Sequence, residues 1–302
     1  MTHAPLQHIG LVVVVFSSAM SAGGTLPAQE SSAVTPLTAS ERMRCLAILR
    51  SGLAADEFWP AMHAAEALTL AGHQQEVVAA LRDRLPKETN DQRRGGLARE
   101  LVRAGDRSAL PVLTRILNDP SSNGRVHAAE SLFKLGETGD GPGLAQAMSQ
   151  SENLPLKLMS AAALAKAGCH SALTVLRKHL SSEDRLARNT VCFALARLGQ
   201  AEDIAPLRKR LAVETDPLAR ANLIHALACL GDPAGRQALQ SGLDAADAGI
   251  RTAAAEHVGL ARCTEHRPRL VELLGDANLD TRIRAAQSLL ALSLPATNRR
   301  QP

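Results

Sequence analysis

The sequence predicts an all-α fold, a right-handed α-α superhelix of about 16 helices, from three repeating features. A landmark leucine recurs every 31 to 33 residues from Leu68 to Leu289, with a valine in one copy. A glycine follows this residue by four positions in six copies, and a residue eleven positions before it is nearly always a good helix cap. So constant a period indicates one helical hairpin stacked in series, and we expect a single solenoid over residues 41–294.

Residues 184–211 show the anatomy of one unit. Apolar residues at helical spacing predict a first helix that Asp184 can cap at its start and Gly199 can end. A second apolar stripe from Ile204 to Leu211 predicts a second helix. Two helices this short cannot bury both stripes alone, so each unit needs a copy on either side.

The capping column fixes the register of the other units. Seven of its eight members are preferred N-cap types: Glu57 is the exception, and the others are Asn90, Ser121, Asn153, Asp184, Asp216, Asp247 and Asn278. Residues 41–55 match a second helix with no first helix before it, and residues 279–294 match a first helix with none after it. We therefore expect a leading helix, seven pairs and a closing helix, with polar outer faces on the two end helices.

A basic column stands four residues after the caps. It comprises Arg94, Arg125, Lys157, Arg188, Arg220, Arg251 and Arg282. Each member lies seven residues before its landmark residue, which places it on the same inward stripe of the helix. We expect a structural ladder, in which these side chains pair with a neighbouring unit's cap residue or with exposed carbonyls.

The composition restricts the class of partner. The net charge is only +4, and aromatic residues make up 2% of the chain, with no tyrosine. Proteins that bind single-stranded nucleic acid combine a basic groove with aromatic side chains on which bases stack. The sequence therefore gives no indication of a nucleic-acid partner, and alanine and leucine must form the core.

The start of the chain predicts export to the periplasm or secretion. An apolar run at residues 9–16 is followed by small residues, as in a signal peptide over residues 1–28 with cleavage between about 21 and 29. The run is too short for a stable membrane insertion. A flexible linker is expected over 29–40 and a disordered tail over 295–302. The alternative is an apolar leader on a cytoplasmic protein.

Cysteine usage points the other way on localisation. The chain has an odd number of cysteines, and the repeat geometry brings no two of them within disulfide distance: Cys45, Cys169, Cys192, Cys229 and Cys263. We expect free, mostly buried thiols, which disfavours an oxidising compartment.

The repeat motif is clearest in the sixth unit. It reads Asp216-Pro217-x-x-Arg220, then His225-Ala226-Leu227, then Leu230-Gly231-Asp232-Pro233. This motif resembles the HEAT repeat superfamily, in the short form of the phycobilisome-lyase HEAT-like repeats, over residues 41–294. The resemblance implies a protein-binding scaffold. It also admits chromophore lyase subunits, alkylpurine glycosylases and the di-iron deoxyhypusine hydroxylases.

The hydroxylase alternative can be checked against the residues. That family uses adjacent His-Glu pairs, and this sequence has no His-Glu dipeptide. The pairs His63/Glu66 and His127/Glu130 occupy matching places two units apart, too far apart to share a metal, at a helical angle that predicts solvent exposure. We expect ordinary i,i+3 surface pairs, with no metal, cofactor or catalytic residue in the chain.

A second basic track follows the second helices, which line the concave side of HEAT-like stacks. It comprises Arg82, Arg115, Lys178 and Lys209, thickened by Arg177, Arg208 and Arg210. We name these seven residues the basic ridge and expect it to dock an acidic protein partner. The alternative is an ordinary solvated Lys/Arg face.

Together these features predict an exported, monomeric, non-catalytic scaffold that binds a protein partner and carries no cofactor. The competing prediction is an enzyme or enzyme subunit of lyase or oxidoreductase type. A metal or chromophore retained through purification would favour the enzyme.

Overall fold

The computed structural model describes residues 36–294, which form sixteen α-helices, four short 3₁₀-helices and no strand. The predicted all-α class and the predicted number of helices are confirmed for this part of the chain. The proposed signal peptide, most of the linker and the tail lie outside the described residues. Within 36–294, every helix falls short of the length and apolarity that a membrane crossing requires.

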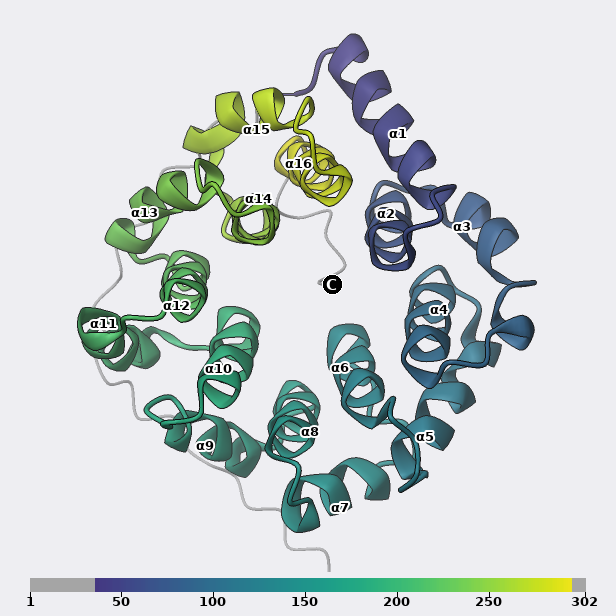
Figure 1. The fold of residues 1–302 in the computed structure, drawn as a ribbon, viewed down its shortest axis with the longest axis vertical. Coiled ribbons are helices and arrows are strands. Elements are labelled where there is room, and N and C mark those ends of the chain that lie inside the picture. The colour runs from purple at the N-terminus through teal and green to yellow at the C-terminus, as the bar shows by residue number, and fades with distance from the viewer. Residues whose placement is uncertain (1–35, 295–302) are drawn as a thin grey trace, which may run out of the picture. The chain divides into compact units, whose positions relative to one another are not determined.

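The helices form two concentric layers (Figure 1). The inner layer holds the first helix of each pair: α2 (Phe58–Leu70), α4 (Asp91–Arg103), α6 (Arg125–Leu135), α8 (Leu154–Lys166), α10 (Arg185–Leu198), α12 (Pro217–Cys229), α14 (Ala248–Leu260) and α16 (Leu279–Leu292). The outer layer holds the second helices: α1 (Ala39–Leu53), α3 (Gln74–Leu81), α5 (Leu110–Asn118), α7 (Pro142–Gln150), α9 (His170–Lys178), α11 (Ile204–Val213), α13 (Pro233–Leu243) and α15 (Arg267–Leu273). The 3₁₀-helices cover Leu85–Lys87, Arg107–Ala109, Ala201–Asp203 and Thr264–His266.

The two end helices pack on each other instead of capping an open stack. α16 contacts α14 and α15 on one side and α1 and α2 on the other, while α1 contacts α2 (Figure 1). The inner helix α16 and the outer helix α1 thus pair as an eighth hairpin. Arg267 strengthens this seam through Glu41 at 3.5 Å and the Pro36 carbonyl at 3.1 Å.

The expectation of a polar outer face is therefore wrong for the closing helix, α16. Nine residues of α16 are buried, among them Ile283, Leu289 and Leu292. Each half unit lacks the helix that the other supplies, so closing the ring buries apolar surface that would otherwise face water.

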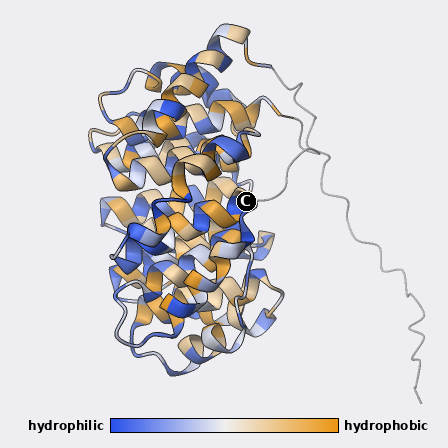
Figure 2. Cartoon of the chain, turned by 90° about the vertical axis from the view of Figure 1, so that its right-hand side faces the viewer, coloured by the Kyte–Doolittle hydropathy of each residue, from blue (hydrophilic) through white to orange (hydrophobic). Residues whose placement is uncertain are grey.

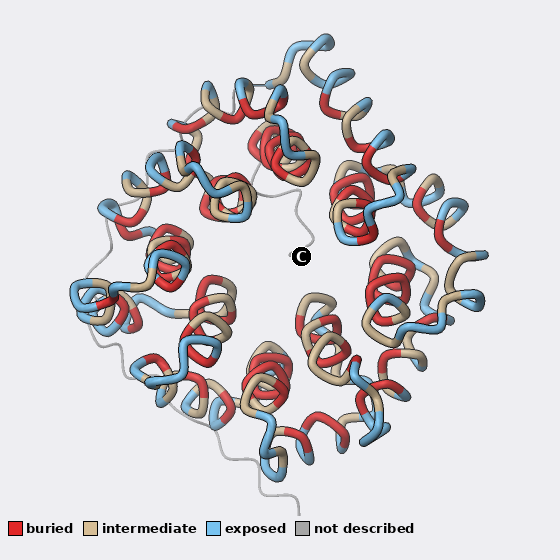
Figure 3. Tube along the Cα trace, in the orientation of Figure 1, coloured by how far each residue is buried: buried red, intermediate tan, exposed pale blue. Residues whose placement is uncertain are grey.

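A continuous apolar core fills the space between the two layers, as predicted. Buried residues face one another across the layers, and exposed residues lie on the outward sides and in the connections (Figure 3). Figure 2 shows the matching alternation of hydrophobic and hydrophilic residues along the helices. The core consists largely of alanine and leucine, with Phe133 among its largest fully buried side chains.

The predicted caps are confirmed in six of eight units. In each of these the capping side chain accepts a hydrogen bond from a backbone N–H of the first turn: Asn90, Asn153, Asp184, Asp216, Asp247 and Asn278. Glu57 occupies the cap position without such a bond. Ser121 is not a cap, because its side chain bonds Asp119 and α6 begins after Gly124.

The turn glycines adopt a left-handed backbone in five of six units, with Gly231 at φ +83° as the example in the motif. Gly199 is the exception, since its backbone is extended at φ −62° and ψ 158°. Gly199 still ends α10 as predicted, without a left-handed backbone. A 3₁₀-helix follows directly at Ala201–Asp203 and provides the turn.

All five cysteines are free thiols in the structure. Cys45, Cys192 and Cys263 are buried. Burial raises the pKa of Cys45 to about 11 and the pKa of Cys192 to about 12. Cys169 differs, because hydrogen bonds from the Ser171 hydroxyl and nearby backbone lower its thiol pKa.

Candidate functional site

The basic ridge lies on the outside of the ring and not on its concave side. Its residues belong to the second helices or to their ends, and these helices form the outer layer (Figure 1). Our placement of the ridge on the inner face is therefore wrong. The expectation that second helices line the concave side came from the resemblance to HEAT-like stacks. In this structure the hairpins curve so that the second helices lie on the outer side.

Much of the ridge joins successive units. Arg82 contacts Asp106 at 3.0 Å, and Arg177 contacts Asp203 at 2.8 Å. Arg208 pairs in the same way with Asp232, which follows the turn glycine of the next unit. These bonds occupy guanidinium groups that were predicted to be free for a partner.

The rest of the ridge divides into one local pair and three unpaired cations. Arg210 contacts Glu214, directly after the end of its own helix, at 2.8 Å. Arg115, Lys178 and Lys209 are exposed, and none has an ion-pair partner within residues 36–294.

The basic column predicted as a structural ladder binds the connections between helices. Four members donate hydrogen bonds to carbonyls just before their own helix: Arg188, Arg220, Arg251 and Arg282. Arg188 also contacts Glu214 at 2.8 Å, and Arg251 contacts Asp276 at 2.9 Å. These two carboxylates lie in the connection of the next unit, so the arginines tie neighbouring hairpins together.

The column is less regular in the earlier units. Arg125 donates to the Leu117 carbonyl at 2.9 Å, and Arg94 contacts Asp91 at 2.7 Å on its own helix. Lys157 is half-buried, and its side chain makes no hydrogen bond or ion pair within the described residues.

A buried charge network occupies the middle of the inner layer. We call the following seven residues, from five helices, the central network: Arg99, Glu100, Arg103, Glu66, Arg284, Glu256 and Arg197. Positive and negative side chains alternate along it. Arginine is suited to such positions because its planar group pairs with two carboxylates at once.

The closing helix supplies the middle of this network. Arg284 of α16 contacts Glu66 of α2 at 2.9 Å and Glu256 of α14 at 3.7 Å. Glu66 also contacts Arg103 of α4 at 3.2 Å, and Glu256 contacts Arg197 of α10 at 2.8 Å. The network therefore extends across the seam where the two ends of the described chain meet.

The sequence interpretation of the His-x-x-Glu pairs as exposed is wrong. Glu66 is 6% exposed, and His63 and Glu130 are half-buried. Glu66 is covered by the neighbouring inner helices, since it contacts Arg103 of α4 and Arg284 of α16, and His63 contacts Asp280 of α16. The pattern was visible in the sequence, since the positions two before and two after the landmark residues are often charged.

The electrostatics of the centre favour fixed charges over proton transfer. Burial raises the pKa of Glu66, but Arg103 and Arg284 together hold it well below its usual value. Burial lowers the pKa of His63, and burial also lowers the pKa of His257 to about 4. General acid–base catalysis near neutral pH is most efficient with a group whose pKa is near 7. The pKa values of Glu66, His63 and His257 are all shifted down, so these residues do not provide such a group.

One lysine in the centre does titrate closer to neutrality. Burial, Arg103 and Arg197 lower the pKa of Lys166 to about 8. Its ammonium lies 5.6 Å from the centre of the Phe133 ring, and Lys134 lies 5.4 Å from that of Phe193. Cations and aromatic faces thus pack together on neighbouring inner helices.

A stacked pair of histidines lies beside the network. His225 of α12 and His257 of α14 have ring centroids 4.3 Å apart, with the planes 13° from parallel. Both are buried, and burial holds the pKa of His225 well below its usual value. Within residues 36–294, no group of three or more His, Cys, Asp or Glu side chains is arranged to hold a metal ion.

Comparison with known proteins identifies a repeat family in part of the chain. Residues 141–228 match the family model for HEAT repeats. No curated protein matches the chain. Human deoxyhypusine hydroxylase in complex with glycerol is similar at 18% identity and a TM-score of 0.41, covering 84% of this chain and 97% of its own.

A second solved structure, an engineered protein, is similar at 16% identity and a TM-score of 0.32. The match covers 82% of this chain and 96% of the engineered one. Overlap at these TM-scores carries no inference about a site or an activity. What the comparisons show is a HEAT-repeat segment at residues 141–228 of this chain.

Proposed function

We propose that this protein is an exported, non-catalytic scaffold that binds an acidic protein partner on a surface formed by the outer helices α9 and α11 and the starts of the inner helices α10 and α12. The proposed contact residues are Lys178, Leu186, Lys209, Val213 and Leu218, which we call the α9–α12 surface. The observation that carries the proposal is that three exposed large apolar side chains and two exposed cations without an ion pair within residues 36–294 lie on four consecutive helices.

The apolar part of this surface is substantial. Val213 is 65% exposed, Leu186 is 56% exposed and Leu218 is 42% exposed. Leu186 and Leu218 lie in the first turns of α10 and α12, whose starts are joined by an ion pair between Arg185 and Asp216 at 3.2 Å. Exposed apolar groups gathered in this way are typical of protein-binding surfaces.

The charges beside these groups favour an acidic partner. Lys209 and Val213 are four residues apart on α11, so they share one face of that helix. Lys178 lies on the preceding outer helix, α9. An apolar contact flanked by ammonium groups favours a partner that presents apolar side chains among carboxylates.

The test is capture of partners from an extract of the native cells, with bound proteins quantified by mass spectrometry. The variant Lys178→Glu/Lys209→Glu/Val213→Ser should lose proteins that the wild type captures. The matched control Arg42→Glu/Lys87→Glu also reverses two exposed cations, which have no ion pair within residues 36–294 and lie on other elements. Capture that is equal for the wild type and the surface variant, with both folded, would reject the proposed surface.

Export and the absence of catalysis are tested separately. Fractionation of the native cells should recover the protein outside the cytoplasm, with a mature N-terminus between about residues 22 and 29. The purified chain should be a colourless monomer without stoichiometric metal. A bound metal or chromophore would instead support the enzyme alternative.

A further inference from the structure

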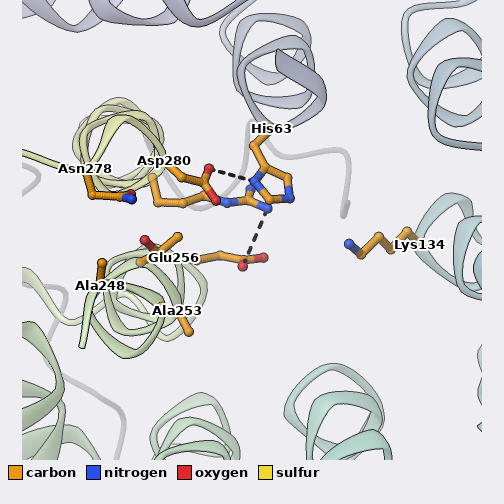
Figure 4. Close-up of a pocket in the computed structure, with 10 residues that line it drawn as sticks. His63, Lys134, Ala248, Ala253, Glu256, Asn278 and Asp280 are labelled. Atoms are coloured by element: carbon orange, nitrogen blue, oxygen red, sulfur yellow. Dashed lines mark hydrogen bonds and ion pairs between the residues drawn. The ribbon is translucent and has the colours of Figure 1, made fainter. Parts of the chain in front are cut away.

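A cavity of about 350 Å³ lies among inner-layer side chains from α2, α6, α14 and α16 (Figure 4). Its polar lining includes His63, Lys134, Glu256, Asp280 and Arg284. Its remaining lining includes the first residues of α14, Ala248 and Gly249, together with Thr252, Ala253 and Asn278. A volume at the lower end of the range for ligand sites fits a small molecule.

Two cationic side chains offer hydrogen-bond donors in this cavity. Arg284 is only 2% exposed, and its Nε–H has no acceptor within the described residues, although its other nitrogens are paired. Lys134 extends toward the cavity from the opposite side (Figure 4). Glu130 accepts from Lys134 at 3.0 Å, but an ammonium group has three donors. A ligand anion could therefore bond to both cations.

Two carboxylates provide acceptors in the same cavity: Glu256, which lies 3.7 Å from Arg284, and Asp280, one turn before Arg284 on α16. Asp280 Oδ1 lies 2.7 Å from His63 Nδ1. An ionised carboxylate only accepts, so this nitrogen carries the proton and the other ring nitrogen is an acceptor. Burial raises the pKa of Glu256, but Arg284 and Arg197 hold it far below its usual value, so this group is negative.

The lining charges balance, with two cations against two carboxylates. A simple anion would be repelled by the carboxylates, and a simple cation by the lysine and arginine. We propose that the cavity binds a small zwitterion of the free α-amino-acid class. Its carboxylate bonds to Lys134 and Arg284, and its ammonium bonds to the two acidic side chains.

The apolar part of the lining restricts the ligand further. Ala248, Gly249 and Ala253 leave room for a small side chain and offer no aromatic face. L-Alanine is therefore the first probe, with glycine and L-serine as close alternatives. The inference does not depend on the α9–α12 surface, because the cavity is lined by α2, α6, α14 and α16, and none of these helices contributes to that surface.

The experiment is isothermal titration calorimetry of the purified chain with L-alanine. Propionate lacks the ammonium and ethylamine lacks the carboxylate, so each tests half of the site. We expect L-alanine, glycine or L-serine to bind, and each fragment to bind at least about tenfold more weakly. No binding of any of the three amino acids at millimolar concentration, or equal binding of propionate, would overturn the proposal.

Variants locate the binding in the cavity. Lys134→Met and Asp280→Asn should each weaken binding about tenfold, while Lys87→Met on the outer layer should leave it unchanged. Asp280→Asn keeps an acceptor for His63 and preserves the local structure, so it provides the test even if Lys134→Met fails to fold. Unchanged affinity in a folded cavity variant would contradict the assignment.

Discussion

Replacing Arg284 with methionine should open the seam at which the two end helices meet. Methionine keeps much of the volume and removes the charge. Arg284 is 2% exposed and bonds to Glu66 at 2.9 Å, with Glu256 at 3.7 Å. The substitution leaves both carboxylates with one arginine fewer in a buried place.

The expected loss follows from these contacts. Removing one partner of a buried ion pair typically costs about 3–5 kcal/mol, because the remaining charge stays desolvated. Glu66 retains Arg103 and Glu256 retains Arg197, so the lower end applies. We expect the free energy of unfolding to fall by about 3 kcal/mol.

Urea unfolding and amide hydrogen exchange measure this effect. The free energy should fall, and faster exchange should be concentrated in α1, α2 and α16, with α8 on the far side of the ring little changed (Figure 1). Arg42→Met is the matched control, because Arg42 is exposed on α1 and unpaired within residues 36–294. It should change stability by less than about 0.5 kcal/mol.

Two results would refute this reasoning. One is a loss below about 1 kcal/mol, which would mean that the buried network contributes little to closure. The other is faster exchange in α8 equal to that in α16, which would place the effect outside the seam. As a further check, Glu66→Gln combined with Arg284→Met should cost less than the sum of the two single changes, because the partners share one network.

Three other measurements test the structure. Burial raises the pKa of Glu130, but Lys134 and Arg99 lower it to about 2 from an unfolded value near 4.5. Its contribution to stability is therefore present above about pH 5 and lost as the pH falls toward 2, and Glu130→Gln should flatten the melting temperature over that range. Gly95→Ala should stabilise α4 by about 0.5–1 kcal/mol, since a Cβ there meets nothing closer than 3.9 Å; unchanged or lower stability would contradict this. Cys169 should react with a thiol reagent before the four other thiols; faster labelling of any of those would contradict its lowered pKa.

The repeat could be predicted almost completely from the sequence. The spacing of Leu68 and its successors, the cap column and the turn glycines are local features, and each recurs often enough to correct for single exceptions. The failure at Ser121 is local too, because its side chain bonds Asp119 and does not cap α6. Gly199 ends α10 as predicted, although its backbone is extended there.

The candidate sites were harder to predict, because they depend on which layer a helix occupies. Arg82 and Arg208 were expected to face a partner, yet each reaches an aspartate of the next unit. Glu66 was expected to face water, yet it lies beside Arg284, which is 218 residues away in the sequence. Helical angle gives the face on which a residue lies but does not say what that face meets.

The sequence by itself determined the helical hairpin, its number of copies and the alanine and leucine core, because these follow from periodicity and capping within each unit. Only the tertiary structure decided which helices lie inside and that the two ends of the described chain join. Those outcomes depend on small rotations between successive units, which add up around the ring. The total rotation cannot be inferred from the sequence of any one unit. The central network and its cavity exist because the rotations bring α16 back to α1 and α2.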